Sequence, residues 1–473
     1  MPAASLELQG ASRGERIRSA LYLIALAGLM SWASLVPLIP GQSSVMARAA
    51  VLVVLTVAAW AIGVFKEPVT SLLFFLAAIL WHVAPLGVIF SGLESPAWWL
   101  VFGGSITGVA MRTTGLGARF TGMLLARFSA SYGHCVAAVV LVSLALAFVM
   151  PSTTGRVLLL LPIALSLCDR LGFSPGRPGR TGLVLAVAAA CYMPPTSILP
   201  ANIPNAVLFG AAESLYGIEL RYGPYLLLHF PVLGALKSLL LIWVVQRVFP
   251  DKIAPMPRTS TLPKRLSIAE RNLLIVLFAS LAFYVTDFLH GISPAWISLA
   301  AGIICLLPQT GILRAEDINQ QVHISPLLYV AAFLGLGAVI SSSGLGTWAS
   351  GVLFQWIHLT PAAGITNLLL LAGIAALVGL VTTLPGLPSV LTPLAGNWAT
   401  LAGLPLYSVL MLQVPVFSTV LFPYQSPPMM IAMQIAGVSI KDATRFCLTV
   451  AAVTLVVLLP LDLGWWWVLG LIK

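Results

Sequence analysis

The sequence has few charged residues and no paired cysteines, and both absences limit what the chain can be. Only 8% of its 473 residues are charged, whereas 59% are hydrophobic. Soluble globular domains carry about a quarter charged residues, so the composition excludes an ordinary soluble enzyme. The mean hydropathy of +1.01 indicates a chain that is surrounded mostly by lipid. The five cysteines stand singly in apolar runs, which argues against a disulfide framework or a metal site.

The sequence also lacks the motifs of enzymes and primary pumps. It contains no H-E-x-x-H, no G-x-S-x-G and no Walker A loop, so we expect no enzymatic activity. The net charge of +10 is spread too thinly for a nucleic-acid partner, and we interpret it as charge on cytoplasmic loops. We expect no cofactor beyond Na⁺ or H⁺ as a coupling ion.

Long apolar runs are what the sequence does have. A membrane-spanning helix needs about 20 apolar residues. Clear spans of this kind lie near 19–39, 47–65, 69–90, 225–247, 273–290, 295–310 and 443–470. The stretches 97–215 and 326–437 are equally apolar but rich in Gly, Pro, Ser and Thr, which predicts broken helices and re-entrant hairpins around a transport site. With hairpins at 133–168 and 362–402, the prediction is an all-α polytopic membrane protein of about eleven transmembrane helices.

Basic residues predict the orientation of these spans. Arg13, Arg16 and Arg18 precede the first span, so the N-terminus is expected in the cytoplasm and the C-terminus outside. The short loops favour a bacterial inner membrane, with a eukaryotic organelle as the alternative.

The same pattern divides the chain into five parts. They are N-terminal scaffold helices (1–96), a first repeat (97–247), a cytoplasmic linker (248–272), further scaffold helices (273–325) and a second repeat (326–473). Hairpin tips are predicted near 151–156 and 383–389, and broken helices near 191–205 and 415–428.

Three short motifs indicate an internal repeat. The pentapeptide TTGLG at 113–117 recurs as SSGLG at 342–346, an offset of 229. Pro162 then matches Pro393 at an offset of 231, and a third match, of 203–205 with 427–429, has an offset of 224. Motifs in one order at nearly one spacing are typical of duplicated units. The predicted topology gives the two copies opposite orientations, as in many secondary transporters.

The order of these motifs resembles that of the divalent-anion:sodium symporter family, the sodium/sulfate and sodium/dicarboxylate carriers of the ion transporter superfamily. The resemblance begins near Trp98 and includes the glycine-rich segment 101–119. Residues 151–156 stand where the family has a Ser-Asn-Thr hairpin tip, and 202–205 and 425–428 stand where it has Thr-Pro-Pro-Asn loops. The resemblance implies a homodimer with an elevator-type transport domain for a small divalent anion.

The chain departs from the family at the asparagines. Thr153 and Leu384 stand at the two tip positions, Met429 stands in the second loop, and only Asn205 remains. Sodium needs several oxygen ligands, so these losses argue against sodium coupling. The remnants of sodium sites are Ser152, Thr154, Asn205, Thr383 and Ser426.

Arg156 adds a positive charge at the first predicted tip. An arginine at mid-membrane costs at least about 2.5–3.5 kcal/mol, so it should face a cavity and a partner. Our hypothesis is that its guanidinium replaces the charge of bound sodium and binds the anion with bidentate geometry. The alternative is an arginine that snorkels or caps hairpin carbonyls. We also expect Lys237, in the middle of its span, to pair with Asp287.

The candidate substrate-binding residues are the polar side chains of the tips and breaks. They are Ser152, Thr153, Thr154, Arg156, Asn202, Asn205, Thr383, Ser389, Thr419, Gln425 and Ser426. The hydroxyls could instead satisfy backbone groups freed at turns. The predicted function is secondary transport of a dicarboxylate or sulfate by an elevator mechanism. The alternatives are a sodium-independent exchanger and a non-transporting paralogue that acts as an anion sensor or scaffold.

Overall fold

The structure is a computed structural model in which helices are the regular elements of the described chain. It describes residues 13–35, 43–120, 131–150, 152–253, 265–314, 316–317, 321–357, 359 and 364–472. Seven helices are long and apolar enough to cross a membrane: Ile17–Leu35, Ser44–Ile62, Tyr222–Val248, Ile268–Val285, Ser325–Ser342, Gly364–Val381 and Ile440–Val468. The all-α class is therefore confirmed, whereas the number of eleven crossings stays a prediction.

Residues typical of helix N-termini stand at the starts of N-terminal helices. These helices are α1 (Arg13–Leu35), α2 (Ser44–Ile62), α3 (Glu67–Leu80), α4 (Leu86–Ile89) and α5 (Ser91–Glu94). Ser43 caps α2 by accepting a hydrogen bond from the Met46 N–H at 3.3 Å. Pro68 fits the first turn of α3, where a backbone N–H has no partner within the helix.

The first punctuated stretch forms a hairpin and a broken helix. Its elements are α6 (Pro96–Thr113), α8 (Tyr132–Ala147), α9 (Thr153–Arg170), α10 (Pro178–Tyr192), η1 (Pro194–Ser197), η2 (Leu199–Ala201) and α11 (Ile203–Tyr216). A long helix follows, made of α12 (Tyr222–His229), the π-helical η3 (Phe230–Leu236) and α13 (Lys237–Val248). The predicted linker 248–272 lies partly outside the described residues, since 254–264 are not among them.

The second punctuated stretch also forms a hairpin and a broken helix. After α14 (Ile268–Val285), α15 (Asp287–His290), α16 (Pro294–Leu306) and η4 (Pro308–Thr310), the chain forms α18 (Ser325–Ser342), α19 (Leu345–Trp356), α20 (Gly364–Val381), η5 (Leu384–Gly386), α21 (Leu387–Ala402), α22 (Leu406–Met411), α23 (Gln413–Phe417), η6 (Pro423–Gln425) and α24 (Pro427–Ala436). Its last helix consists of α25 (Ile440–Val453), the π-helical η7 (Thr454–Leu458) and α26 (Leu459–Val468).

The first motif of the proposed repeat forms the same turn in both stretches. Gly115 follows α6 with φ 77° and Gly344 follows α18 with φ 75°. Glycine is the residue that adopts this left-handed conformation without a steric cost. The duplicated TTGLG and SSGLG motifs therefore have a common physical purpose, which is to end one helix and redirect the chain. The inverted orientation of the two copies stays a prediction.

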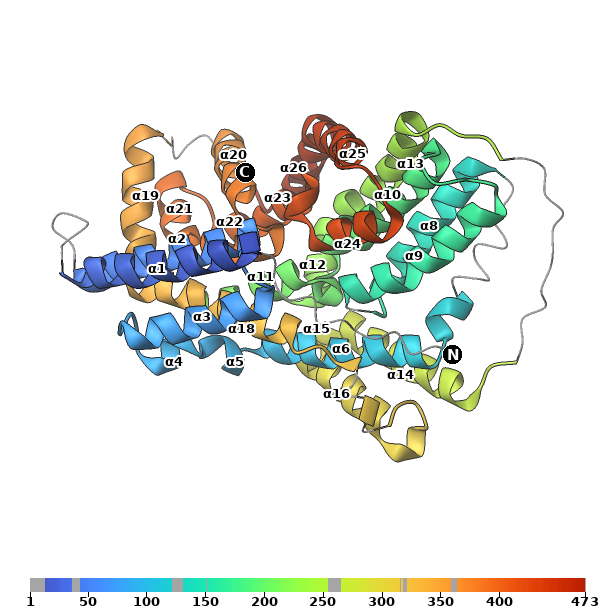
Figure 1. Cartoon of the computed structure of the whole chain (residues 1–473), viewed down its shortest axis with the longest axis horizontal. Coiled ribbons are helices and arrows are strands. Elements are labelled where there is room, and N and C mark those ends of the chain that lie inside the picture. Colours follow the sequence, from blue (N-terminus) through green and yellow to red (C-terminus); the bar gives the residue numbers. More distant parts are fainter. Residues whose placement is uncertain are drawn as a thin grey trace.

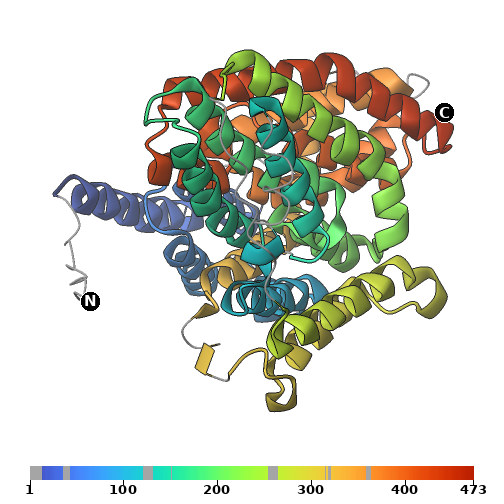
Figure 2. The same cartoon turned by 90° about the vertical axis from the view of Figure 1, so that its right-hand side faces the viewer.

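The broken helices lie between the two hairpins. Figure 1 shows α8 and α9 on one side of the molecule, α20 and α21 on the other, and α10, α11, α23 and α24 between them. Helix α10 packs on α8 and α9, while α11 packs on α21 and α20 packs on α23. The views in Figures 1 and 2 place α6, α14 and α16 together at one side of this assembly.

Small residues bring α6 and α16 into close contact. A Cβ added to Gly302 would lie 3.1 Å from Gly103 Cα, and Ser298 Oγ donates to the Leu100 carbonyl at 2.9 Å. Small side chains let membrane helices approach closely, and hydroxyls then bind across the interface. This contact ties α6, which begins the first stretch, to the helices that precede the second.

Candidate substrate site at the two broken helices

The first hairpin turns just before Thr153. Helix α8 ends at Ala147 and α9 begins at Thr153; Pro151 of the predicted tip lies outside the described residues. Ser152 caps α9 by accepting from the Gly155 N–H at 3.2 Å. The Thr153 side chain is buried, whereas Thr154 is exposed. Only one of these two threonines therefore faces the protein interior.

Arg156 is fully buried and joins the hairpin to the first broken helix. Its Nη1 donates to the Ala201 carbonyl at 3.0 Å and to the Met150 carbonyl. Its Nη2 donates to the Cys191 carbonyl at 2.8 Å and to Thr153 Oγ1 at 3.4 Å. Its Nε has no hydrogen-bond partner among the described residues. In this structure the guanidinium thus caps carbonyls, as the alternative interpretation of Arg156 in the sequence analysis expected. None of these contacts is with a carboxylate.

Two asparagines lie where the first break ends: Asn202 directly precedes α11, which starts at Ile203, and Asn205 lies in the first turn of α11. Asn202 Nδ2 donates to the Tyr192 carbonyl at 3.4 Å, and Asn205 Nδ2 donates to the Ile198 carbonyl at 2.8 Å. Both Oδ1 atoms are buried without a partner in the described residues. Buried acceptors normally find a donor, a water molecule or an ion, so these two oxygens are ligand candidates.

The polar side chains at the tip of the second hairpin make hydrogen bonds within the protein. Helix α20 ends at Val381, and the 3₁₀ turn Leu384–Gly386 leads into α21. Thr383 Oγ1 lies 2.9 Å from the Tyr329 hydroxyl, and Ser389 Oγ donates to the Gly386 carbonyl at 2.6 Å. Thr383 therefore fastens the tip to α18, and Ser389 stabilises the turn.

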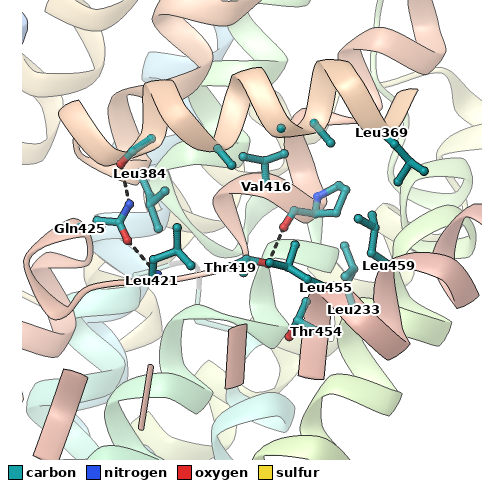
Figure 3. Close-up of a pocket in the computed structure, with 15 residues that line it drawn as sticks. Leu233, Leu369, Leu384, Val416, Thr419, Leu421, Gln425, Thr454, Leu455 and Leu459 are labelled. Carbon is teal, nitrogen blue, oxygen red and sulfur yellow. Dashed lines mark hydrogen bonds between the residues drawn. The ribbon is translucent and has the colours of Figure 1, made fainter. Parts of the chain in front are cut away.

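In the second break, Gln425 organises the loop between α23 and α24. Its Oε1 accepts from the Leu421 and Phe422 N–H groups at 2.8 and 2.9 Å. Its Nε2 donates to the Gly379 carbonyl, so that Gln425 bridges this loop and α20 (Figure 3). Thr419 Oγ1 donates to the Pro415 carbonyl at 2.8 Å, and Ser426 Oγ is buried without a partner in the described chain.

A cavity of about 210 Å³ lies beside the second break (Figure 3). Its lining is mostly leucine, alanine and glycine, with Thr419, Gln425 and Thr454 as polar members. Neither Arg156 nor another residue of the first hairpin lines it. An apolar cavity without a positive group is a poor site for a dianion.

The two breaks touch each other. The Tyr192 hydroxyl, at the end of α10, donates to the Phe417 carbonyl at the end of α23, at 3.2 Å. Helix α9 also packs on α24, and α11 packs on η5. The structure thus gathers Arg156 and Asn205 at the first break and brings the second break next to it.

Lys237 does not form the ion pair that the sequence suggested. Its Nζ donates to the Ser418 carbonyl at 2.7 Å and to Ser418 Oγ at 2.9 Å. Asp287 Oδ2 instead accepts from the Tyr222 N–H at 2.6 Å, at the start of α12. The expected pair was wrong because Asp287 caps a helix N-terminus, while Lys237 points to the second break.

Asp251 holds the start of α10. It accepts from the Gly179 N–H at 2.8 Å and from Arg177 Nη2 at 2.7 Å. Burial acts to raise the pKa of this carboxyl, but hydrogen bonds from Arg177, Lys252 N and Gly179 N outweigh it and hold the pKa below its usual value. Helix α10 is therefore anchored at its start by Asp251 and at its end by Arg156.

The chain is similar to several known proteins. A family model described as the sodium:sulfate symporter transmembrane region matches residues 17–472. A membrane protein of Cupriavidus necator is 23% identical over 56% of this chain and 53% of its own. The inner membrane protein YbhI of Escherichia coli is 24% identical over 61% of this chain and 63% of its own. The chain thus spans between about half and two thirds of the length of these relatives.

A solved transporter structure is also similar to this chain. The crystal structure of the YdaH transporter of Alcanivorax borkumensis covers 83% of this chain and 88% of its own, at 16% identity and a TM-score of 0.47. The family match extends over nearly the whole chain and includes both hairpins and both breaks. This multi-pass membrane protein belongs to the sodium:sulfate symporter family.

Proposed function

We propose that this chain carries a small divalent anion, of the dicarboxylate or sulfate type, across a bacterial inner membrane without sodium coupling. Membership of the family makes it a membrane transporter of the sodium:sulfate symporter type. The observation that supports the proposal best is Arg156, a fully buried guanidinium where hairpin and broken helix meet. A buried charge needs compensation, and an anionic substrate supplies it.

Arg156 has one edge with which to bind the anion. Within the part of the chain that the structure describes, the Nε–H has no partner, and the neighbouring Nη2 has a long contact of 3.4 Å with Thr153 Oγ1. The Nε and Nη2 groups form a fork that matches two oxygens of a carboxylate or sulfate. Binding would exchange the weak Thr153 contact for a charge-assisted bond and leave the Ala201 and Cys191 carbonyls capped.

The remaining substrate candidates take different roles. Ser152, Thr153, Asn202, Asn205 and Ser426 lie at the first tip or the breaks and supply hydroxyls, amides and unpartnered oxygens. Thr383, Ser389, Thr419 and Gln425 hold local backbone. Of the former sodium remnants, the exposed Thr154 is the least suited to a buried ion.

The elevator mechanism is the part of the proposal that concerns movement. Hairpins and broken helices form one transport unit, and the helices α1 to α6, α14 and α16 form the scaffold. We propose a homodimer with its N-terminus in the cytoplasm and its C-terminus outside, in contact with lipid and with no nucleic-acid partner. Two inverted repeats would place the substrate between them near the middle of the membrane.

Counter-transport in liposomes tests this function. Purified protein is reconstituted, the vesicles are loaded with sulfate or a dicarboxylate, and uptake of a panel of labelled dianions is measured with sodium or choline outside and with or without a pH gradient. We expect saturable dianion uptake that is equal in sodium and choline. Uptake that requires sodium, or is absent for every dianion, contradicts the proposal.

A second candidate function is anion sensing without transport. It is favoured by the four oxygen contacts of Arg156, because a guanidinium bound in this way can serve as a structural clamp. Dianion-dependent thermal stabilisation of the purified protein together with no flux in liposomes would support the sensor over the transporter.

A further inference from the structure

A second basic side chain is buried at the second break. Lys237 is fully buried at the start of α13. Its ammonium lies 2.7 Å from the Ser418 carbonyl oxygen, 2.9 Å from Ser418 Oγ and 3.5 Å from Thr419 Oγ1. An ammonium has three N–H donors; the two Ser418 oxygens accept short hydrogen bonds, and Thr419 Oγ1 offers a third, long contact.

The oxygens that surround Lys237 belong to the end of a half-helix. Helices α22 and α23 form the apolar segment Leu406–Phe417, and Ser418 follows directly. The C-terminal end of a helix carries unpaired carbonyls and a partial negative charge. In transporters with broken helices, such ends and unwound carbonyls coordinate the coupling cation. One carbonyl and two hydroxyls at this place are therefore the oxygens of a cation site, and an ammonium fills it.

A buried acid acts electrostatically on this lysine. Asp462 is fully buried, neither of its carboxylate oxygens has a hydrogen-bond partner in the described residues, and it interacts electrostatically with Lys237. Lys237 directly follows the π-helical turn η3, and Asp462 lies four residues after the end of the π-helical turn η7. These two turns contact each other. Such turns are rare and occur often at functional sites. Asp462 also follows Lys237 by 225 residues, within the 224–231 spacing of the repeat motifs.

We propose that the Lys237 ammonium is a resident monovalent cation, which occupies the oxygen site of the second break in place of sodium, with Asp462 as its counter-charge. This inference rests on the proposed sodium-independent transport and gives its physical cause at the second break. It follows that removing the ammonium while leaving its space empty turns these oxygens and Asp462 into a sodium site.

Direct binding of radioactive sodium to the purified full-length protein tests this inference. We expect no saturable sodium binding to the wild type. Lys237→Ala and Lys237→Ser leave room and should each bind one sodium ion per chain. Lys237→Met fills the space without a charge and should bind none. The matched control Lys252→Ala removes an exposed lysine and should behave as the wild type.

The outcomes separate this inference from the proposed function, because sodium binding is measured without any anion or flux. Saturable sodium binding to the wild type overturns the inference whatever the variants do. It is also overturned if monodisperse Lys237→Ala and Lys237→Ser bind no sodium. Should both variants be unfolded in choline chloride, recovery of monodisperse protein in sodium chloride supports the inference, and failure to recover in either salt overturns it.

Discussion

Each of the two broken helices is hydrogen-bonded to one buried basic side chain, and these two side chains come from different parts of the chain. Arg156 comes from the hairpin that directly precedes the first break and lies 35 residues from its partner Cys191. Lys237 reaches the second break from α13 and lies 181 residues from Ser418. The first break and its hairpin thus form a local unit, whereas the second break is tied to the other half of the molecule.

The charges at the two breaks differ as well. Lys237 shares its surroundings with the buried acid Asp462, which acts on it electrostatically. The hydrogen bonds of Arg156 lead only to carbonyls and a hydroxyl. A positive charge without an acid attracts an anion more strongly than a balanced pair does. This comparison supports our proposal that the anion binds at the first break rather than at the second.

Replacing Arg156 should give the largest effect. We expect Arg156→Gln to reduce dianion uptake by about 100-fold, equivalent to about 2.7 kcal/mol, the range of a charge-assisted hydrogen bond. Arg156→Lys retains the charge and should keep uptake within about tenfold of the wild type. The measurement is initial uptake in liposomes, normalised to reconstituted protein. Equal uptake by Arg156→Gln and the wild type would contradict the difference that we infer between the two breaks, since the Arg156 charge would then have only a structural role.

The paired turns at Gly115 and Gly344 sharpen the comparison of the two stretches. Alanine in the left-handed conformation costs about 1–2 kcal/mol. The cost should be larger for Gly344→Ala, because its Cβ would lie 3.2 Å from Met46 Cε, whereas the Gly115 position is open. Thermal unfolding in detergent measures both, with Gly351→Ala inside helix α19 as the control, where alanine has room and should stabilise by about 0.5–1 kcal/mol. Equal stability of all three variants would argue against a shared turn.

Tyr192→Phe removes the direct hydrogen bond between the breaks. Loss of the 3.2 Å bond to the Phe417 carbonyl should lower the free energy of unfolding by about 1 kcal/mol. Tyr424→Phe is the matched control, because its hydroxyl makes an exposed bond to the Leu380 carbonyl at 2.7 Å. A larger loss of stability in the control would show that the contact between the breaks is energetically unimportant.

Asp251→Asn should give the smallest effect, with a defined pH dependence. We expect a loss of about 0.5–1 kcal/mol at neutral pH, where Asp251 caps α10 and binds Arg177. The folded pKa of Asp251 is lowered, so its stabilisation is present above the unfolded pKa and is lost as the pH falls through the folded pKa. Unfolding curves of the two proteins should therefore converge in acid, and a constant difference across pH would contradict this assignment.

Much of the helical layout could be predicted from local patterns. Apolar length, glycine and proline located five of the seven predicted spans, because a membrane forces each backbone group to find a partner within its own segment. Near 69–90 and 295–310 the structure has the shorter helices α3 and α16 instead. The π-helical turns η3 and η7 were missed, although Pro231 and Pro460 lie in or beside them and remove a backbone donor. The exposed Thr154 shows that a motif position alone does not decide which way a side chain points.

The sequence alone determined that this is an all-helical membrane protein with interrupted helices, and that charge in its interior is scarce. Only the tertiary structure decided what that charge touches: Arg156 meets the Cys191 and Ala201 carbonyls, and Lys237 meets Ser418 rather than Asp287. The physical reason is distance along the chain. Helix formation depends on neighbours within a few residues, whereas the partner of a buried cation is chosen by the packing of segments that lie far apart in sequence.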